Sequence, residues 1–153
     1  MRAIRALLLS LTLVVGCQSA NTDVTVEKAW IRLAAVPNQP AAAYFTLTGG
    51  AADDTLIAVH NDNVIKAEMH ESMAGMSNMA GMSMSEMKPV ASVQVPAAAQ
   101  VVFAPGGKHV MLFGVNESVK PGSKSQLILV FKSGLQVAEN ATVVAAGDGE
   151  PKF

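Results

Sequence analysis

Short apolar stretches separated by turn residues make up this sequence after its first twenty positions. None of them keeps the 3.6-residue spacing of apolar side chains over the length of a globular helix. Val, Ile, Leu, Thr and aromatic residues instead gather in brief runs that end at Gly, Pro or Asn. Short strands with regularly spaced turns are typical of a sandwich or a barrel. The sequence therefore predicts an all-β domain.

We expect an antiparallel β-sandwich of about eight strands. The candidate strands span residues 24–33, 42–48, 55–60, 64–70, 87–95, 101–104, 109–115, 126–132 and 135–144. Between the last two, Ser133-Gly134 is the strongest hairpin signal of the chain, because Gly readily adopts the backbone conformation that a tight turn requires.

Residues 1–17 have the organisation of an export signal. Two arginines precede an apolar run, residues 6–15, that is too short to cross a bilayer as a mature helix. The run ends in Val-Val-Gly-Cys, which resembles the lipobox of bacterial lipoproteins. Lipidation of Cys17 would anchor the chain to a membrane in the periplasm. Ordinary cleavage after Ala20 is the alternative, although Gln18 fits its small-x-small pattern poorly.

The domain organisation follows from this signal. After it we expect a polar tether at 18–23, one sandwich domain at 24–146 and a frayed tail at 147–153. Without the two arginines of the signal, 9 basic and 12 acidic residues remain, a formal charge near −3. Nucleic-acid binding is not expected on that balance.

The side chains available for chemistry are few. Cys17 is the only cysteine, so the mature domain has neither a disulfide nor a thiolate for catalysis or metal binding. The sequence has no carboxylate pair, Ser-His-Asp arrangement or phosphate-binding Gly loop, and we do not expect an enzyme. A soft metal ion would have to be bound by Met and His.

Residues 72–87 form a Met-rich segment that holds six of the nine methionines of the chain. The six alternate with Ser, Gly, Ala and Asn, and the segment lacks the Leu, Ile or Val of a core element. We expect a flexible loop; an adaptable apolar cover on the sandwich is the alternative. Its methionines are Met73, Met76, Met79, Met82, Met84 and Met87.

His109 and Met111 stand two positions apart in a predicted strand, so their side chains project from one face. Core packing often produces such a pair, which is weak evidence alone. The signal becomes stronger because His70 ends another predicted strand and the Met-rich segment follows it. In addition, the turn at 105–107 allows strand ends to meet.

Metal chemistry narrows the choice of ion. Thioethers are soft and neutral and bind Cu(I) or Ag(I), and two thioethers with two neutral imidazoles leave a Cu(I) complex at a charge of only +1. Structural zinc sites require more Cys and His than the chain offers, and a blue-copper centre requires a Cys thiolate. The residues therefore favour Cu(I).

The motifs resemble the PCu(A)C family of periplasmic copper chaperones, whose signature is His, ten residues, Met, twenty-one residues and His-x-Met. Here twenty-one residues separate Met87 from His109, and Met111 completes the motif. The resemblance covers nearly the whole mature chain. It implies a cupredoxin-like sandwich with His70, Met87, His109 and Met111 as Cu(I) ligands. It also implies delivery of the ion to a recipient such as the dinuclear copper centre in subunit II of cytochrome c oxidase.

The first spacing departs from the family pattern, because sixteen residues separate His70 from Met87. Met82 or Met84 could therefore replace Met87 as ligand, or the other methionines of the segment could form a secondary collecting site. Two other functions remain open. One is a copper or silver buffer that protects the envelope without a specific recipient, and the other is a metal-free β-sandwich lipoprotein.

Three nearby residues are expected to have other roles. Met69 neighbours His70 and points to the opposite face, which favours core packing. Trp30 is expected in the core as well, and a position near the metal as a shield is the alternative. His60 falls outside the pattern and is expected to be a partly exposed strand residue.

Overall fold

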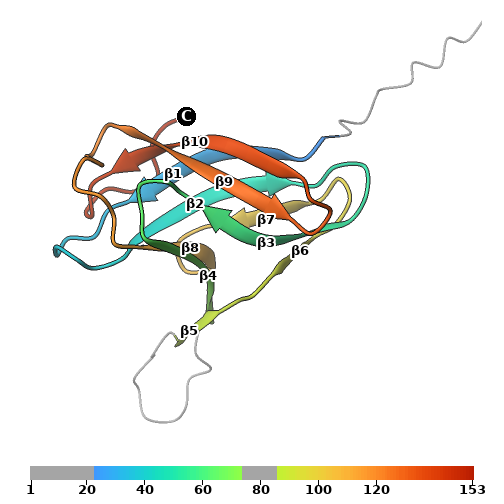
Figure 1. Cartoon of the computed structure of the whole chain (residues 1–153), viewed down its shortest axis with the longest axis horizontal. Helices are drawn as coiled ribbons and strands as arrows, with labels where there is room; N and C mark the ends of the chain where they lie inside the picture. The colour runs from blue at the N-terminus through green and yellow to red at the C-terminus, as the bar shows by residue number, and fades with distance from the viewer. Residues whose placement is uncertain (1–22, 74–85) are drawn as a thin grey trace, which may run out of the picture.

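The structure is a computed structural model that describes residues 23–73 and 86–153. Ten strands form one curled sheet, and the described residues contain no helix, which confirms the all-β class (Figure 1). The strands are β1 Thr25–Arg32, β2 Ala41–Thr48, β3 Asp54–His60, β4 Lys66–Met73, β5 Glu86–Pro89, β6 Val93–Val95, β7 Gln100–Phe103, β8 Lys108–Phe113, β9 Lys124–Phe131 and β10 Gln136–Val144. In the described part of the chain, no helix could therefore cross a membrane.

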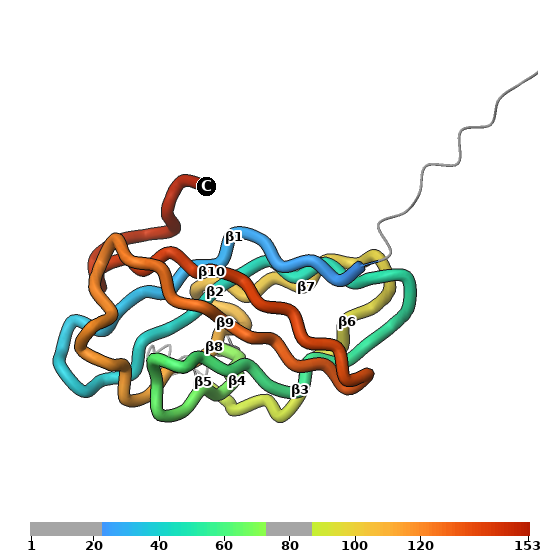
Figure 2. The backbone as a smooth tube through the Cα atoms, turned by 45° about the horizontal axis from the view of Figure 1, so that its top comes forward, coloured from blue at the N-terminus to red at the C-terminus, as the bar shows by residue number. Residues whose placement is uncertain are grey.

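The sheet curls so that strands from the two ends of its order come together. That order is β5-β4-β8-β7-β2-β1-β10-β9-β3-β6, and β8 also pairs with β2. All pairings are antiparallel except β1 with β10 and β7 with β8. Strands β3 and β4, near opposite ends of the order, are in contact, which closes the sheet around a core (Figure 2).

The expectation of a single strand at residues 87–95 is wrong, because the chain changes its partner strand within this range. Its first part, β5, pairs with β4, whereas its last part, β6, pairs with β3. Pro89 ends β5, and the Val90 amide donates to the Met69 carbonyl at 2.8 Å before the chain crosses to the other strand. This crossing accounts for the difference between the nine candidate ranges and the ten observed strands.

Both ends of the Met-rich segment 72–87 are strand residues rather than loop. Ser72 pairs with Met87 and Met73 pairs with Glu86, so β4 runs further than expected and β5 begins earlier. The remainder of the segment, residues 74–85, lies outside the described residues.

The hairpin between β9 and β10 forms at Ser133-Gly134, as the sequence predicts. The Phe131 amide donates to the Leu135 carbonyl at 2.9 Å, and Gly134 has a φ of 91°. That conformation lies in the left-handed region that Gly adopts at little cost. The turn chemistry therefore fixes the pairing of the two strands locally.

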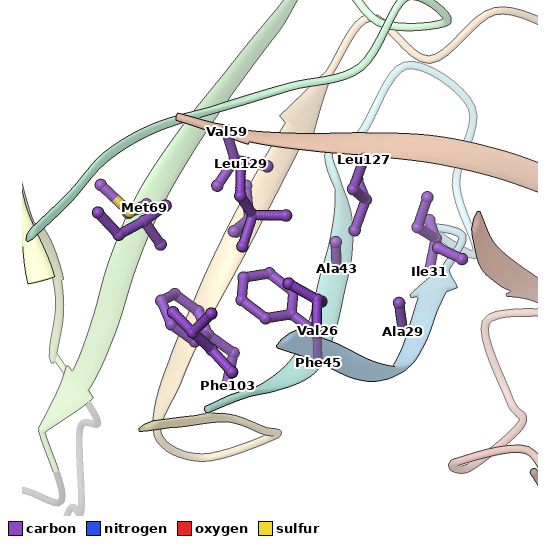
Figure 3. Packing of buried hydrophobic residues seen from close by; sticks show 14 of the residues in the cluster. Val26, Ala29, Ile31, Ala43, Phe45, Val59, Met69, Phe103, Leu127 and Leu129 are labelled. Atoms are coloured by element: carbon purple, nitrogen blue, oxygen red, sulfur yellow. The ribbon is translucent and has the colours of Figure 1, made fainter. Parts of the chain in front are cut away.

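The core lies between the facing sides of the curled sheet and is built by alternation along the strands. Figure 3 shows Met69 and Phe103 turned into the same interior as Leu129. On β8, Val110 and Leu112 point inward with almost no exposure. Each such buried side chain contributes about 1.5 to 3 kcal/mol through removal of apolar surface from water. The core therefore decides which face of β4 and β8 points outward.

Candidate metal site

His70 on β4 and His109 on β8 are direct cross-strand partners. Their ring centroids lie 6.0 Å apart. The neighbouring pair, Met69 and Val110, is buried in the core, so the two imidazoles lie on the outer face. A shift of one residue would expose that apolar pair, and the packing of the core therefore fixes the position of the two histidines.

The two predicted thioether ligands lie on the same outer face. Met111 stands two positions from His109, and Met87 on β5 pairs with Ser72, which stands two positions from His70. Met87, His109 and Met111 line one cavity of about 280 Å³. His109 is only 6% exposed, whereas Met87 is 55% exposed. The structure thus brings the four predicted ligands to one patch on three neighbouring strands.

His109 has one ring nitrogen fixed by the backbone. Its Nδ1 lies 3.0 Å from the Gly107 carbonyl oxygen. Because a carbonyl only accepts hydrogen bonds, the neutral ring that makes this bond carries its proton on Nδ1 and its lone pair on Nε2. Metal-binding histidines commonly use the same arrangement, in which the second ring nitrogen donates to a carbonyl or a carboxylate.

His70 has no such partner. Both of its ring nitrogens are buried and make no hydrogen bond, and no other described side chain has a buried polar atom in that state. An unsatisfied buried polar group costs about 1 to 3 kcal/mol. The Glu68 carboxylate lies 3.7 Å from Nε2, beyond hydrogen-bond distance. An ion that accepts a nitrogen lone pair would give one of these two nitrogens a partner.

Glu68 supplies a negative charge beside the two histidines. Its carboxylate oxygen Oε1 lies 2.7 Å from the Lys66 ammonium nitrogen. The hydrogen bond from Lys66 is the main cause that holds the pKa of Glu68 below its ordinary value. Partial burial opposes this effect, and the charge of Lys66 adds to it. Glu68 is therefore ionised at neutral pH and favours a cation on this face.

The donor set fits a soft ion better than a hard one. Within the described ranges, no three His, Cys, Asp or Glu side chains come close enough to hold a metal ion. Met87 and Met111 add two thioethers beside His109, and thioethers favour soft ions such as Cu(I).

An aromatic wall borders the cavity on the side of β1 and β2. Trp30 is buried, but on the outer face rather than in the core cluster where it was expected. Its ring centroid is 4.4 Å from that of Tyr44. Arg32 donates from Nη2 to the Tyr44 hydroxyl at 2.9 Å. Burial raises the pKa of Tyr44, while the charge and the hydrogen bond of Arg32 oppose that rise.

Sequence reasoning gave no role to Arg32 or Tyr44, although both line the cavity. The signal was present, because Trp30-x-Arg32 and Ala42-x-Tyr44 have the same two-residue spacing as His109-x-Met111. Alternation along β1 and β2 would have placed these side chains on one face.

The other residues that the sequence singled out lie in the core, at the end of a strand or outside the described residues. Met69 is 6% exposed and packs in the core, as expected. Met73 is the last residue of β4. Cys17 and four methionines lie outside the described residues, namely Met76, Met79, Met82 and Met84.

Comparison with known proteins adds a family and a fold. Residues 24–143 match the model of the LpqE-like family, described as "Putative lipoprotein LpqE-like". A relative from Leifsonia xyli subsp. xyli, named "Putative lipoprotein Lxx21020", is 28% identical over 142 residues, which cover 86% of this chain and 80% of the relative.

Three solved structures share the fold. The apo PmoF2 PCuAC domain has a TM-score of 0.65 and 22% identity, over 84% of this chain and 94% of that domain. The copper-bound PCuAC domain from PmoF2 has a TM-score of 0.63 and 23% identity, over 80% and 92%. The solution structure of CuI-DR1885 from Deinococcus radiodurans has a TM-score of 0.60 and 22% identity, over 83% and 81%. These matches confirm the cupredoxin-like fold and the resemblance to PCu(A)C domains.

Proposed function

Because this chain belongs to the LpqE-like family and has the fold of PCuAC domains, we propose that it is a copper chaperone of the bacterial envelope. It binds one Cu(I) ion on the outer face of β4, β5 and β8 and transfers it to another protein. The ligands are His70, Met87, His109 and Met111.

One observation carries this proposal. His70 and His109 face each other across two strands with lone pairs that no described group uses. Burying two imidazole nitrogens without a partner is unfavourable for a purely structural role. A monovalent ion between them binds one nitrogen lone pair of each ring, and the ionised Glu68 offsets its charge.

The position of the site suits a carrier. Met87 is 55% exposed and comes from β5, an end strand of the sheet, so an incoming ligand can reach the ion on that side. The copper-bound domain from PmoF2 and the Cu(I) form of DR1885 show that proteins of this fold bind copper. For this chain, copper binding, the choice of Cu(I) and the ligand set are part of the proposal.

We further propose a lipid anchor on Cys17, which would hold the domain in the periplasm. The proposed recipient is the dinuclear copper centre in subunit II of cytochrome c oxidase. The match to lipoproteins supports the anchor, and the resemblance to PCu(A)C chaperones supports the recipient.

The first experiment is an anaerobic Cu(I) titration against a colorimetric chelator. We expect one tight site per chain in the parent protein. Loss of a residue that only orients a metal ligand costs about 10- to 100-fold in affinity, so His70→Ala and His109→Ala should each cost more than about 100-fold. The matched control is His60→Ala, which removes an exposed histidine from β3 and should leave affinity unchanged.

The ligand role of Met87 needs its own comparison. Met87→Leu preserves volume and removes the thioether, so it should weaken Cu(I) binding. The matched variants are Met82→Leu and Met84→Leu. If one of these weakens binding while Met87→Leu does not, the ligand is another methionine of the Met-rich segment.

Transfer to the copper-free recipient domain separates a chaperone from a buffer. We expect faster transfer to that domain than to an unrelated apo copper protein. More than one tightly bound ion per chain, with no preference between acceptors, would instead establish a buffer. Failure of the parent protein to bind Cu(I) would leave a metal-free lipoprotein.

Acid should weaken copper binding. A protonated imidazole has no lone pair for a metal, and histidine side chains commonly gain that proton between about pH 5 and 8. We expect Cu(I) affinity to fall below about pH 6. A binding constant that stays flat from about pH 5 to 8 would contradict histidine ligation.

A further inference from the structure

The cavity beside the proposed ligands has a second wall that copper binding does not use. Arg32, Ala42 and Tyr44 form this wall on β1 and β2, beside His109 and Met111 of β8. The cavity has a volume of about 280 Å³, which is enough for a side chain of another molecule. We consider a role for this wall in the release of copper, and that role rests on the proposed function.

The register of three strands explains why this space is open. Arg32 pairs with Ala42, and Ala42 pairs with Met111, so the three residues form one row across the outer face. Neighbouring strands lie about 4.8 Å apart. The alanine in the middle of the row is too small to fill the space between the guanidinium and the thioether.

Arg32 is a half-buried cation without an acidic partner. No carboxylate of the described residues forms an ion pair with it. Its guanidinium is held instead by the Trp30 and Tyr44 rings, with centroids 5.9 Å and 5.5 Å from Cζ, and by the hydrogen bond to the tyrosine oxygen. A guanidinium has five N–H donors. Arg32 is therefore fixed in place with donors to spare.

Tyr44 adds a further donor to the same wall. Its oxygen accepts the hydrogen bond from Arg32, so its own proton is available for another acceptor. Burial raises the pKa of Tyr44, which keeps this proton in place at neutral pH. A cation and a neutral O–H group on one wall are complementary to an anion.

We propose that this cavity admits an anionic metal-binding group of the receiving protein, a thiolate or a carboxylate. Arg32 and Tyr44 bind its negative charge while its donor atom reaches the ion from the side of His109 and Met111. One bond from copper to the chain breaks as one bond from copper to the incoming donor forms. Copper stays Cu(I), and no electron moves. Arg32 thus selects which acceptors remove the ion quickly.

The test compares three small thiols that carry different charges beside their sulfur. Because that charge also changes how readily each thiol ionises, every rate is expressed per thiolate. Mercaptoacetate is anionic, mercaptoethanol is neutral and cysteamine is cationic. Each is mixed in excess with the Cu(I)-loaded protein, and the rate of copper loss is followed by stopped flow. A charge-assisted hydrogen bond supports a preference of about tenfold for mercaptoacetate over cysteamine in the parent protein.

The variants separate the local effect of Arg32 from overall charge. Arg32→Gln should reduce the tenfold preference to nearly none, whereas Arg32→Lys should retain part of it. Lys132→Gln removes one exposed positive charge from the turn between β9 and β10 and should leave the preference unchanged. Ala42→Leu fills the cavity without changing charge and should slow removal by all three thiols. Equal effects of Arg32→Gln and Lys132→Gln would overturn the proposal.

A measurement without copper keeps this test independent of the proposed function. Acetate and mercaptoacetate are titrated into the metal-free protein while the NMR signals of Arg32 and Tyr44 are followed. We expect both anions to shift these signals in the parent protein and not in Ala42→Leu. If the parent protein binds no Cu(I), the proposed function fails, while shifts at Arg32 would still show the anion site. If it binds Cu(I) but neither anion shifts these signals, the anion site is wrong and the proposed function stands.

Discussion

The two faces of the β4–β8 strand pair differ in whether their buried side chains all have partners. The inner face carries Met69, Val110 and Leu112, which are all buried in one apolar cluster. The outer face carries His70 and His109, where the former has two buried nitrogens without a partner. The apolar side chains of the inner face therefore need no hydrogen-bond partner, whereas the outer face leaves buried nitrogens without one.

The comparison shows how a stable core can position an unsatisfied site. Adjacent residues on a strand point to opposite faces, so each inward side chain of β8 places an outward one next to it. Packing of Val110 against Met69 thereby fixes the distance between the two imidazoles. The same strand register thus sets both the stability of the core and the geometry of the proposed ligands. Substitutions on the inner face should change stability, and substitutions on the outer face should change copper binding.

The largest effect is expected from truncation on the inner face. Leu112→Ala leaves a cavity in a site that is 1% exposed and should lower the free energy of unfolding by about 2 to 5 kcal/mol. Met111→Leu, one position away on the outer face, keeps its volume and should cost less than about 1.5 kcal/mol. Urea unfolding of the two metal-free variants measures both. Similar losses would contradict the division into two faces.

Copper should stabilise the protein through the outer face alone. At a free Cu(I) concentration about 100 times Kd, binding to the folded state adds about 2.7 kcal/mol. We expect this increment in the parent protein and, at low denaturant, in Leu112→Ala, whereas His70→Ala should lose it. Thermal unfolding with and without Cu(I) under anaerobic conditions measures it. An increment that survives in His70→Ala would place the ion elsewhere.

Replacement of the unsatisfied histidine should stabilise the metal-free protein. His70→Leu removes two buried nitrogens that lack partners and keeps an apolar side chain in their place, so the free energy of unfolding should rise by about 1 kcal/mol. The same variant should lose Cu(I) affinity. His109→Leu is the matched control, because it removes a nitrogen that is already hydrogen-bonded to Gly107 and should not stabilise. A loss of stability in His70→Leu would contradict the account of an unsatisfied site.

The smallest effect is expected far from the ligands, at Asp54 on β3. Its carboxylate accepts hydrogen bonds from the Ser133 hydroxyl and amide and from the Thr55 amide, which tie β3 to the β9–β10 turn. The Ser133 hydroxyl is the main cause that lowers the pKa of Asp54 below its ordinary 3.8. Because the pKa is lowered in the folded state, the ionised Asp54 carboxylate stabilises the protein fully above about pH 4. This stabilisation is lost as the pH falls through the pKa of Asp54 in the folded state.

Asp54→Asn should therefore be slightly less stable than the parent protein at pH 7, and the two should converge at low pH. Denaturant unfolding at several pH values measures this difference, and Cu(I) affinity should be the same in both proteins. A constant difference down to pH 2 would show that the carboxylate charge is not responsible.

The sequence predicted those parts of the fold that depend on local chemistry. Short apolar runs that end at turn residues located most strands, and Ser133-Gly134 located the hairpin. The split between β5 and β6 was missed, because it depends on which distant strand each segment pairs with. Apolar character alone carries no information about partners.

The candidate site was predicted to a similar extent. Spacing placed His109 and Met111 on one face, and the resemblance to a family added His70 and Met87. The wall made by Arg32 and Tyr44 was missed, because it forms only when β1 and β2 lie beside β8. The hydrogen bond that fixes the His109 ring was also beyond sequence reasoning, since it comes from a backbone carbonyl of the preceding turn.

X-ray absorption spectroscopy of the protein loaded with one Cu(I) tests the central claim most directly. We expect two imidazole nitrogens and two sulfur atoms around the ion, with loss of one imidazole in His70→Ala and loss of one sulfur in Met111→Leu. A shell of sulfur atoms alone, or a spectrum that does not change in His70→Ala, would contradict a site on the outer face of β4 and β8.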